Sequence, residues 1–216
     1  MSLRKSVIGL SLAGVLAFGA LGSPVVDTGI KVECVSKNSY KFTVRATKST
    51  LGVGEAEVVA SIPESNKGKY TYKVVDSKGK KSDGVIVIED GTNLVLKGAK
   101  VGNFRVKVTY NGKGAATYKD KVLKGIKVEV KQAPEYITSS KKSYRIKLGQ
   151  KVRLPIKLSK DSHSKLYVEV SGKAVKYTGS NWIGSTYVEA VSTGVSTVYF
   201  NTYNGKKVSV NILVVK

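Results

Sequence analysis

Hydrophobic and polar residues alternate in short runs over most of this 216-residue chain. A period of two places every second side chain on the same face, as in a strand with one buried face. After residue 22, no 11-residue window keeps the 3.6-residue period of an amphipathic helix. The clearest alternating runs, each predicted to be one strand, are residues 40–46, 104–110, 126–130, 152–158, 166–170 and 208–212.

Turn-forming residues separate these runs. Asn-Gly between two alternating segments is a strong hairpin signal, because both residues tolerate a positive φ. Regularly spaced strands without helices predict an all-β fold, either a sandwich or a barrel. The turn signals are Asn66-Lys67-Gly68, Ser77-Lys78-Gly79, Asp90-Gly91, Asn111-Gly112 and Asn204-Gly205.

An internal repeat divides the chain into two copies of one module. The sequence Thr109-Tyr110-Asn111-Gly112-Lys113 recurs as Thr202-Tyr203-Asn204-Gly205-Lys206. Each copy follows a glycine and a strand, and a Leu-Gly turn precedes each by about 55 residues. These turns lie in Leu51-Gly52-Val53-Gly54-Glu55 and Lys147-Leu148-Gly149-Gln150-Lys151. We therefore predict two β-sandwich domains, 23–132 and 133–216, with the boundary near Pro134.

Several features of residues 136–216 resemble the bacterial immunoglobulin-like domain of group 2, known as BIG2. They are the turn Leu148-Gly149-Gln150, the late Gly194 before Val198-Tyr199-Phe200, the hairpin Asn204-Gly205-Lys206-Lys207 and the closing strand Val210-Asn211-Ile212-Leu213-Val214-Val215. The resemblance is weaker over 29–131. It implies two tandem immunoglobulin-like sandwiches and a display role, as in bacterial adhesins, accessory modules of secreted enzymes and phage virions. Tyr72 and Tyr167 are expected at the core position where that family often has tryptophan, and Trp182 elsewhere.

The first 22 residues are typical of a secretory signal peptide. Arg4 and Lys5 precede an uncharged segment, and small residues stand before Ser23 at the expected cleavage point. The apolar segment is short for a membrane-spanning helix, so we expect no transmembrane helix in the mature chain. The alternative is an apolar N-terminal arm that is retained and packs within an assembly.

Basic residues greatly outnumber acidic ones, 37 against 15, giving a net charge of +22. The excess is spread evenly: residues 23–131 hold 21 basic and 11 acidic side chains, and residues 132–216 hold 14 and 4. Such a field attracts polyanions, although scattered lysines also solubilise strands and protect sheet edges. We expect weak, nonspecific polyanion binding and no dedicated nucleic-acid site.

Few residues offer catalytic or metal-binding chemistry. The chain has one cysteine, Cys34, and one histidine, His163, too few for a structural zinc site. His163 lies in the polar stretch Asp161-Ser162-His163-Ser164, where we expect a solvated loop and no Ser-His-Asp triad. Cys34 is expected to be an inert core residue. Glu55 with Glu57, and Glu89 with Asp90, are paired carboxylates beside turns that match no calcium loop. We predict no enzyme, no catalytic residue, no cofactor and no metal.

The function predicted from the sequence is a structural or adhesive protein with two immunoglobulin-like modules on the bacterial cell exterior, secreted or surface-bound. Two alternatives remain open. One is a phage virion component, such as a head decoration or tail protein, and the other is an accessory module that binds polyanions or glycans. Expected partners are protein subunits, further copies of the chain, or cell-wall and glycan polymers. The sequence identifies no ligand-binding residues.

Overall fold

The computed structural model describes residues 43–111 and 123–216. Within them the structure is almost entirely β, with a single 3₁₀ turn, η2 (Glu64–Asn66). The predicted all-β fold is confirmed. The predicted leader or arm, residues 1–22, and Cys34 lie outside the described residues.

We call residues 43–111 and 123–131 the first half, and these described residues form eight strands. They are β1 (Thr43–Val44), β2 (Lys48–Gly52), β3 (Ala56–Ser61), β4 (Tyr70–Asp76), β5 (Val85–Asp90), β6 (Asn93–Gly98), β7 (Gly102–Tyr110) and β8 (Leu123–Lys131). One sheet has the order β1-β3-β6-β5 and the other β2-β8-β7-β4, with β2 parallel to β8. If β1 and β2 are two parts of strand A, the sheets read ABED and A′GFC, which is the strand order of an immunoglobulin-like sandwich.

Nine strands form the second half. They are β9 (Ile137–Ser139), β10 (Ser143–Lys147), β11 (Lys151–Arg153), β12 (Ile156–Leu158), β13 (Leu166–Ser171), β14 (Val175–Tyr177), β15 (Tyr187–Ala190), β16 (Gly194–Thr202) and β17 (Lys207–Val215). The sheet β10-β17-β16-β13 again reads A′GFC, with β10 parallel to β17. The other layer is made of β12-β9 and β11-β15-β14, which correspond to A, B, E and D.

The single strand predicted over residues 152–158 is wrong, because the chain breaks into β11 and β12 around Leu154 and Pro155. Proline has no amide hydrogen to give to a ladder, so a central strand is interrupted there. Leu154 compensates by exchanging hydrogen bonds with Thr186: its amide donates to the Thr186 carbonyl at 2.7 Å, and it accepts the Thr186 hydroxyl at 2.5 Å. The interruption explains why this layer is divided into two small sheets.

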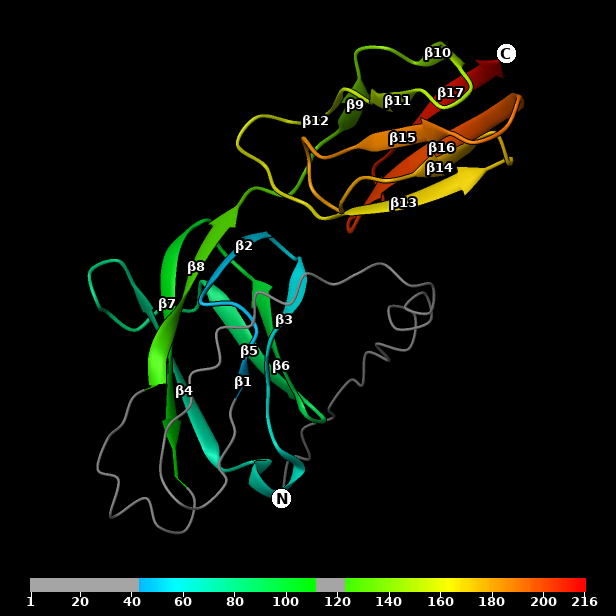
Figure 1. Cartoon of the computed structure of the whole chain (residues 1–216). Coiled ribbons are helices and arrows are strands. Elements are labelled where there is room, and N and C mark those ends of the chain that lie inside the picture. Colours follow the sequence, from blue (N-terminus) through cyan, green and yellow to red (C-terminus); the bar gives the residue numbers. More distant parts are fainter. Residues whose placement is uncertain (1–42, 112–122) are drawn as a thin grey trace, which may run out of the picture.

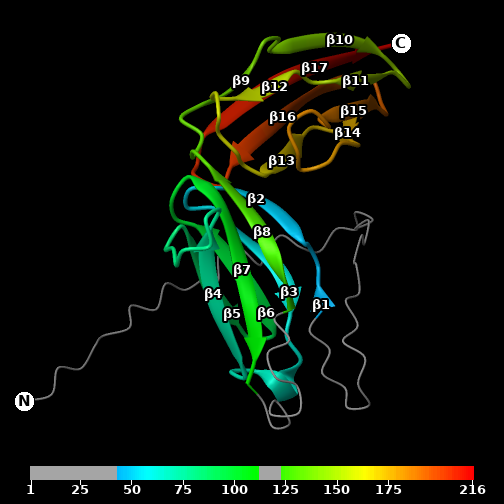
Figure 2. The same cartoon turned by 90° about the vertical axis from the view of Figure 1, so that its left-hand side faces the viewer.

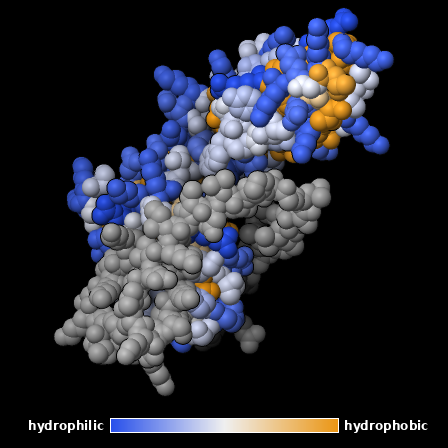
Figure 3. All heavy atoms as spheres, in the orientation of Figure 1, coloured by the Kyte–Doolittle hydropathy of each residue, from blue (hydrophilic) through white to orange (hydrophobic). Residues whose placement is uncertain are grey.

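Each half has its own cluster of buried hydrophobic side chains. The first contains Leu51, Leu94, Leu96, Val106 and Ile126, and the second Leu154, Leu166, Val198, Phe200 and Ile212. Figures 1 and 2 show the two halves joined end to end, with the C-terminus at the end far from the first half. The described surface in Figure 3 is mainly hydrophilic, apart from an apolar area at that far end.

Candidate functional site at the junction of the two halves

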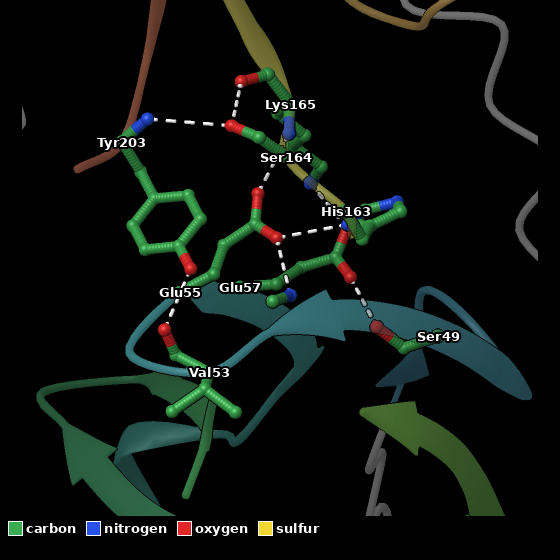
Figure 4. Close-up of polar contacts among 9 residues, drawn as sticks. Ser49, Val53, Glu55, Glu57, His163, Ser164, Lys165 and Tyr203 are labelled. Atoms are coloured by element: carbon green, nitrogen blue, oxygen red, sulfur yellow. Dashed lines mark hydrogen bonds and ion pairs between the residues drawn. The ribbon is translucent and has the colours of Figure 1, made fainter. Parts of the chain in front are cut away.

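A cluster of polar side chains lies where the two halves meet (Figure 4). We call it the junction and define it by Glu55, Glu57, His163, Lys165 and Tyr203. The first two come from the turn after β2 and from β3. The other three come from the loop before β13 and from the turn after β16. Residues more than 100 positions apart in sequence are therefore in direct contact.

Glu55 is the centre of the junction, and only 2% of its surface is exposed. Its carboxylate accepts hydrogen bonds from the amide of Gly52 at 2.8 Å, the amide of Lys165 at 2.8 Å and Nδ1 of His163 at 2.9 Å. Burial alone would raise its pKa, but the bond from His163, the two amide bonds and the charge of His163 together lower it. The carboxylate is thus held ionised inside the contact between the halves.

Lys165 and Glu57 form an ion pair beside the contact between Glu55 and His163. Lys165 Nζ donates to the Glu57 carboxylate, which also accepts the hydroxyl of Ser49. The same ammonium group lies 5.4 Å from the ring of Trp182, and the His163 ring lies 5.5 Å from it. Trp182 therefore packs beside both side chains of the second half that bind the carboxylates, and its ring attracts the ammonium group of Lys165.

Tyr203 completes the junction through the backbone. Its hydroxyl donates to the Val53 carbonyl at 2.6 Å, and burial together with the charge of Glu55 raises its pKa to about 12. A β-carbon at Gly52 would lie 2.5 Å from both this hydroxyl and the His163 carbonyl. Gly52 is therefore required for the close approach of the two halves.

The segment that links the two halves, around Gln132 and Pro134, is also hydrogen-bonded to the second half, in part to the loop that holds His163. Gln132 donates its amide to the Asp161 carbonyl at 3.3 Å and accepts the amide of His163 at 3.1 Å. Asp161 has a φ of 56°, an αL conformation that aspartate tolerates better than most residues. Asn204 Nδ2 donates to the Pro134 carbonyl at 2.8 Å. Side-chain and backbone contacts thus restrain the junction together.

The prediction that His163 lies in a solvated loop is wrong. Its side chain is mostly buried and binds Glu55. The neighbouring serines form other bonds: Ser162 donates to the Ser159 carbonyl, and Ser164 to the Lys165 carbonyl, both at 2.6 Å. The His163 imidazole and the Glu55 carboxylate therefore form a contact between the two halves. Among residues 43–111 and 123–216, no group of three or more metal-ligating side chains is close enough to hold a metal ion.

The other residues singled out in the sequence lie away from the junction or at its margin. Tyr72, predicted at a core position, is partly buried against the first core and donates to Glu89 at 2.5 Å. Tyr167 is 50% exposed on β13, so the prediction of a core position is wrong. Alternation leaves one face of β13 outside the sandwich, and Tyr167 is on it. Asp90 is at the turn between β5 and β6.

The structure corrects the register of the internal repeat. The two Leu-Gly pairs are not equivalent, because Gly54, with a φ of 91°, corresponds to Gly149, with a φ of 79°. The amide of Gly54 donates to Gly98, and that of Gly149 to Ala190, at 2.8 and 2.9 Å. Each turn is closed by the side chain that follows its glycine. Glu55 accepts the amide of Gly52, and Gln150 that of Lys147.

The equivalence of Glu55 and Gln150 is the sequence feature that could have pointed to the junction. The same turn has a neutral amide in the second half and a carboxylate in the first, although either closes the turn. The charge of Glu55 is therefore not needed for the turn itself, and it is used in the contact with His163 and Lys165.

Comparisons with known proteins give fold-level similarity only. No family model matches the chain, and no curated protein matches it in sequence. Among solved structures, domains 4 and 5 of the S-layer protein SbsC are similar with 19% identity and a TM-score of 0.33, over 73% of this chain and 82% of that one. Fibronectin(III)-like modules of Clostridium thermocellum CbhA are similar with 12% identity and a TM-score of 0.39, over 82% of this chain and 94% of that one. The adhesin InvE of Yersinia pseudotuberculosis is similar with 15% identity and a TM-score of 0.32, over 76% of this chain and 56% of that one.

The strand order of both halves defines the class of protein. The chain is an all-β protein with immunoglobulin-like sandwich topology, since both halves have the ABED and A′GFC arrangement. Within the described residues, no helix is long and apolar enough to cross a membrane.

Proposed function

We propose that this protein is a non-enzymatic structural module displayed on the bacterial cell exterior. It consists of two immunoglobulin-like domains, residues 23–132 and 133–216, the second of the BIG2 type. The observation that carries the proposal is the junction. Glu55, a carboxylate that is only 2% exposed, is used to hold two sandwiches in one arrangement.

A fixed arrangement suits a protein that spaces or presents a surface. A flexible linker would let each domain reorient, whereas the bonds of Glu55, Lys165 and Tyr203 couple the halves over several points. Catalysis would instead require an imidazole or carboxylate with a free face toward a substrate. Here Nδ1 of His163 is bound to the buried Glu55 carboxylate, and the ring packs beside Trp182 at the edge of a shallow hollow. Its role is therefore to hold the halves together.

The positive charge supports polyanion contact as a second candidate function. Each half carries a similar excess of basic side chains, and only five of the 37 are arginines. Lysine is a point charge without the planar fork that grips phosphate or carboxylate, so the binding should be broad in specificity. Wall polymers and acidic glycans are the expected partners on a cell exterior.

The test is to locate the native protein and measure its intact mass. Surface display predicts that added protease degrades the protein on intact cells, and that the mass lacks residues 1–22. A protein that is fully protected inside intact cells would contradict display. Retention of residues 1–22 in a particle-associated protein would support the virion alternative instead.

A further inference from the structure

Strand β5 (Val85–Asp90) is the last strand of its sheet among the described residues of the first half (Figure 1). Its neighbour β6 pairs Val85 with Gly98, and the amide of Gly98 donates to Glu55 instead. That pair is therefore not hydrogen-bonded. Because bonding alternates along an antiparallel ladder, the main-chain groups of Val85, Val87 and Glu89 point away from β6. These groups have no backbone partner in the described parts of the chain.

The outer face of β5 carries two isoleucines and, at its end, Asp90. Ile86 and Ile88, 48% and 39% exposed, lie side by side on it. The strand has no lysine or arginine, although the chain has 37. Lysine on an edge strand is a common protection against pairing with another chain. Within the described residues, β5 therefore combines main-chain groups that have no backbone partner with two exposed isoleucines, and Lys73 and Lys81 line the hollow beside Val85 and Val87.

We propose that β5 pairs antiparallel with β5 of a second copy of this chain, around a two-fold axis at Val87. In this register Ile86 of each copy lies opposite Ile88 of the other, so all four exposed isoleucines meet. Val87 exchanges hydrogen bonds with Val87, and Val85 with Glu89. The same patch is used by both copies, as in the commonest type of dimer. This pairing is independent of the proposed surface function.

Charge favours this register over one with its axis at Glu89. An axis at Glu89 would set two carboxylates directly opposite each other, which is destabilising. The axis at Val87 separates them by four residues, about 13 Å along the strands, which exceeds the Debye length of about 8 Å at physiological salt.

Sedimentation velocity of the full chain over a range of concentrations tests the pairing. A monomer–dimer equilibrium is expected, and the double variant Ile86→Lys/Ile88→Lys should weaken it at least about tenfold, because like charges then face each other. The control Val195→Lys/Leu213→Lys adds the same charge at exposed apolar positions of β16 and β17 and should dimerise normally. A wild-type chain that stays monomeric, or a double variant that dimerises as tightly as wild type, overturns the proposal.

Cross-linking tests the register. In a Cys34→Ser background, an equimolar mixture of Ile86→Cys and Ile88→Cys chains should form disulfide-linked dimers faster than either variant alone. Faster cross-linking of Ile86→Cys with itself would overturn the axis at Val87. Val87→Pro provides a second variant, since it removes an outward-pointing amide but no bond to β6. It should abolish dimers while keeping the strand-rich circular dichroism spectrum.

Discussion

At the scale of single residues, Glu55 decides how the two halves meet. It is buried, accepts three hydrogen bonds and contacts two residues of the other half. Its counterpart Gln150 closes the equivalent turn without a charge. Sequence reasoning noted Glu55 as one of a carboxylate pair and His163 as a lone histidine. It did not connect them, because their contact depends on how the two sandwiches dock, and the residue pattern within each sandwich does not specify this.

Replacing Glu55 by glutamine should weaken the junction without disturbing the turn. The amide oxygen can still accept the Gly52 amide, while the charged contact with His163 is lost. We expect the free energy of unfolding to fall by about 2 kcal/mol at neutral pH. Urea unfolding of the full chain measures this. The control Glu64→Gln changes an exposed carboxylate and should stay within about 0.5 kcal/mol of wild type. Equal effects of the two substitutions would contradict the role of Glu55.

The lowered pKa of Glu55 predicts a dependence of stability on acid. Since the folded-state pKa lies below the unfolded value, about 4.3 for glutamate, the unfolded state binds the proton more readily. The contribution is fully present above the unfolded pKa and is lost as the pH falls through the folded pKa. The stability difference between wild type and Glu55→Gln should therefore shrink as the pH is lowered from about 4.3 toward the folded pKa. A difference that grows on acidification would show that the sign is wrong.

At the scale of elements, alternation and turn signals predicted β7, β8, β13 and β17 well, because each has one buried and one exposed face. The prediction of one strand over residues 152–158 was wrong, because Pro155 interrupts the strand although the hydrophobic pattern continues across it. The repeat was recognised in the sequence, but its two copies were aligned two residues out of register at the Leu-Gly turns, since Gly54 and not Gly52 corresponds to Gly149. A Leu-Gly pair resembles a turn in sequence, whereas the structure requires positive φ at the following glycine in the first half.

The break between β11 and β12 should still be a packed part of the core. Leu154 is fully buried between them, so Leu154→Ala should cost about 3 kcal/mol by removing side-chain contacts and leaving a cavity. Leu148→Ala, at a 52% exposed position in the same half, is the matched control and should cost less than about 0.5 kcal/mol. Chemical denaturation of both variants measures the difference. Equal costs would contradict the assignment of Leu154 to the core.

Close approach at the junction should depend on Gly52. Gly52→Ala places a methyl group against the His163 carbonyl and the Tyr203 hydroxyl, so the halves must separate or shift. Tyr203→Phe removes only the hydroxyl bond to Val53 and should cost about 1 kcal/mol. We expect the larger loss of stability for Gly52→Ala. Amide exchange at Lys165, whose amide reports the contact with Glu55, should accelerate more in Gly52→Ala than in Tyr203→Phe. The opposite order would argue against tight packing.

At the scale of the whole molecule, the positive charge on both halves should make polyanion binding strongly dependent on salt. Each lysine–phosphate contact releases counterions, so affinity should fall by orders of magnitude between about 50 and 200 mM salt. Titration against wall polymer, DNA and a neutral glycan measures this. Tight binding to one of them that is insensitive to salt would indicate a shaped site and not a diffuse field.

The fixed arrangement of the two halves is the central claim, and residual dipolar couplings of the full chain test it most directly. If the junction holds the halves as one body, a single alignment tensor will fit the amides of both. In Glu55→Lys, which sets a cation against His163 and Lys165, two different tensors should be needed. Two independent tensors in the wild-type protein at neutral pH would contradict the claim, because the halves would then reorient freely about the linker.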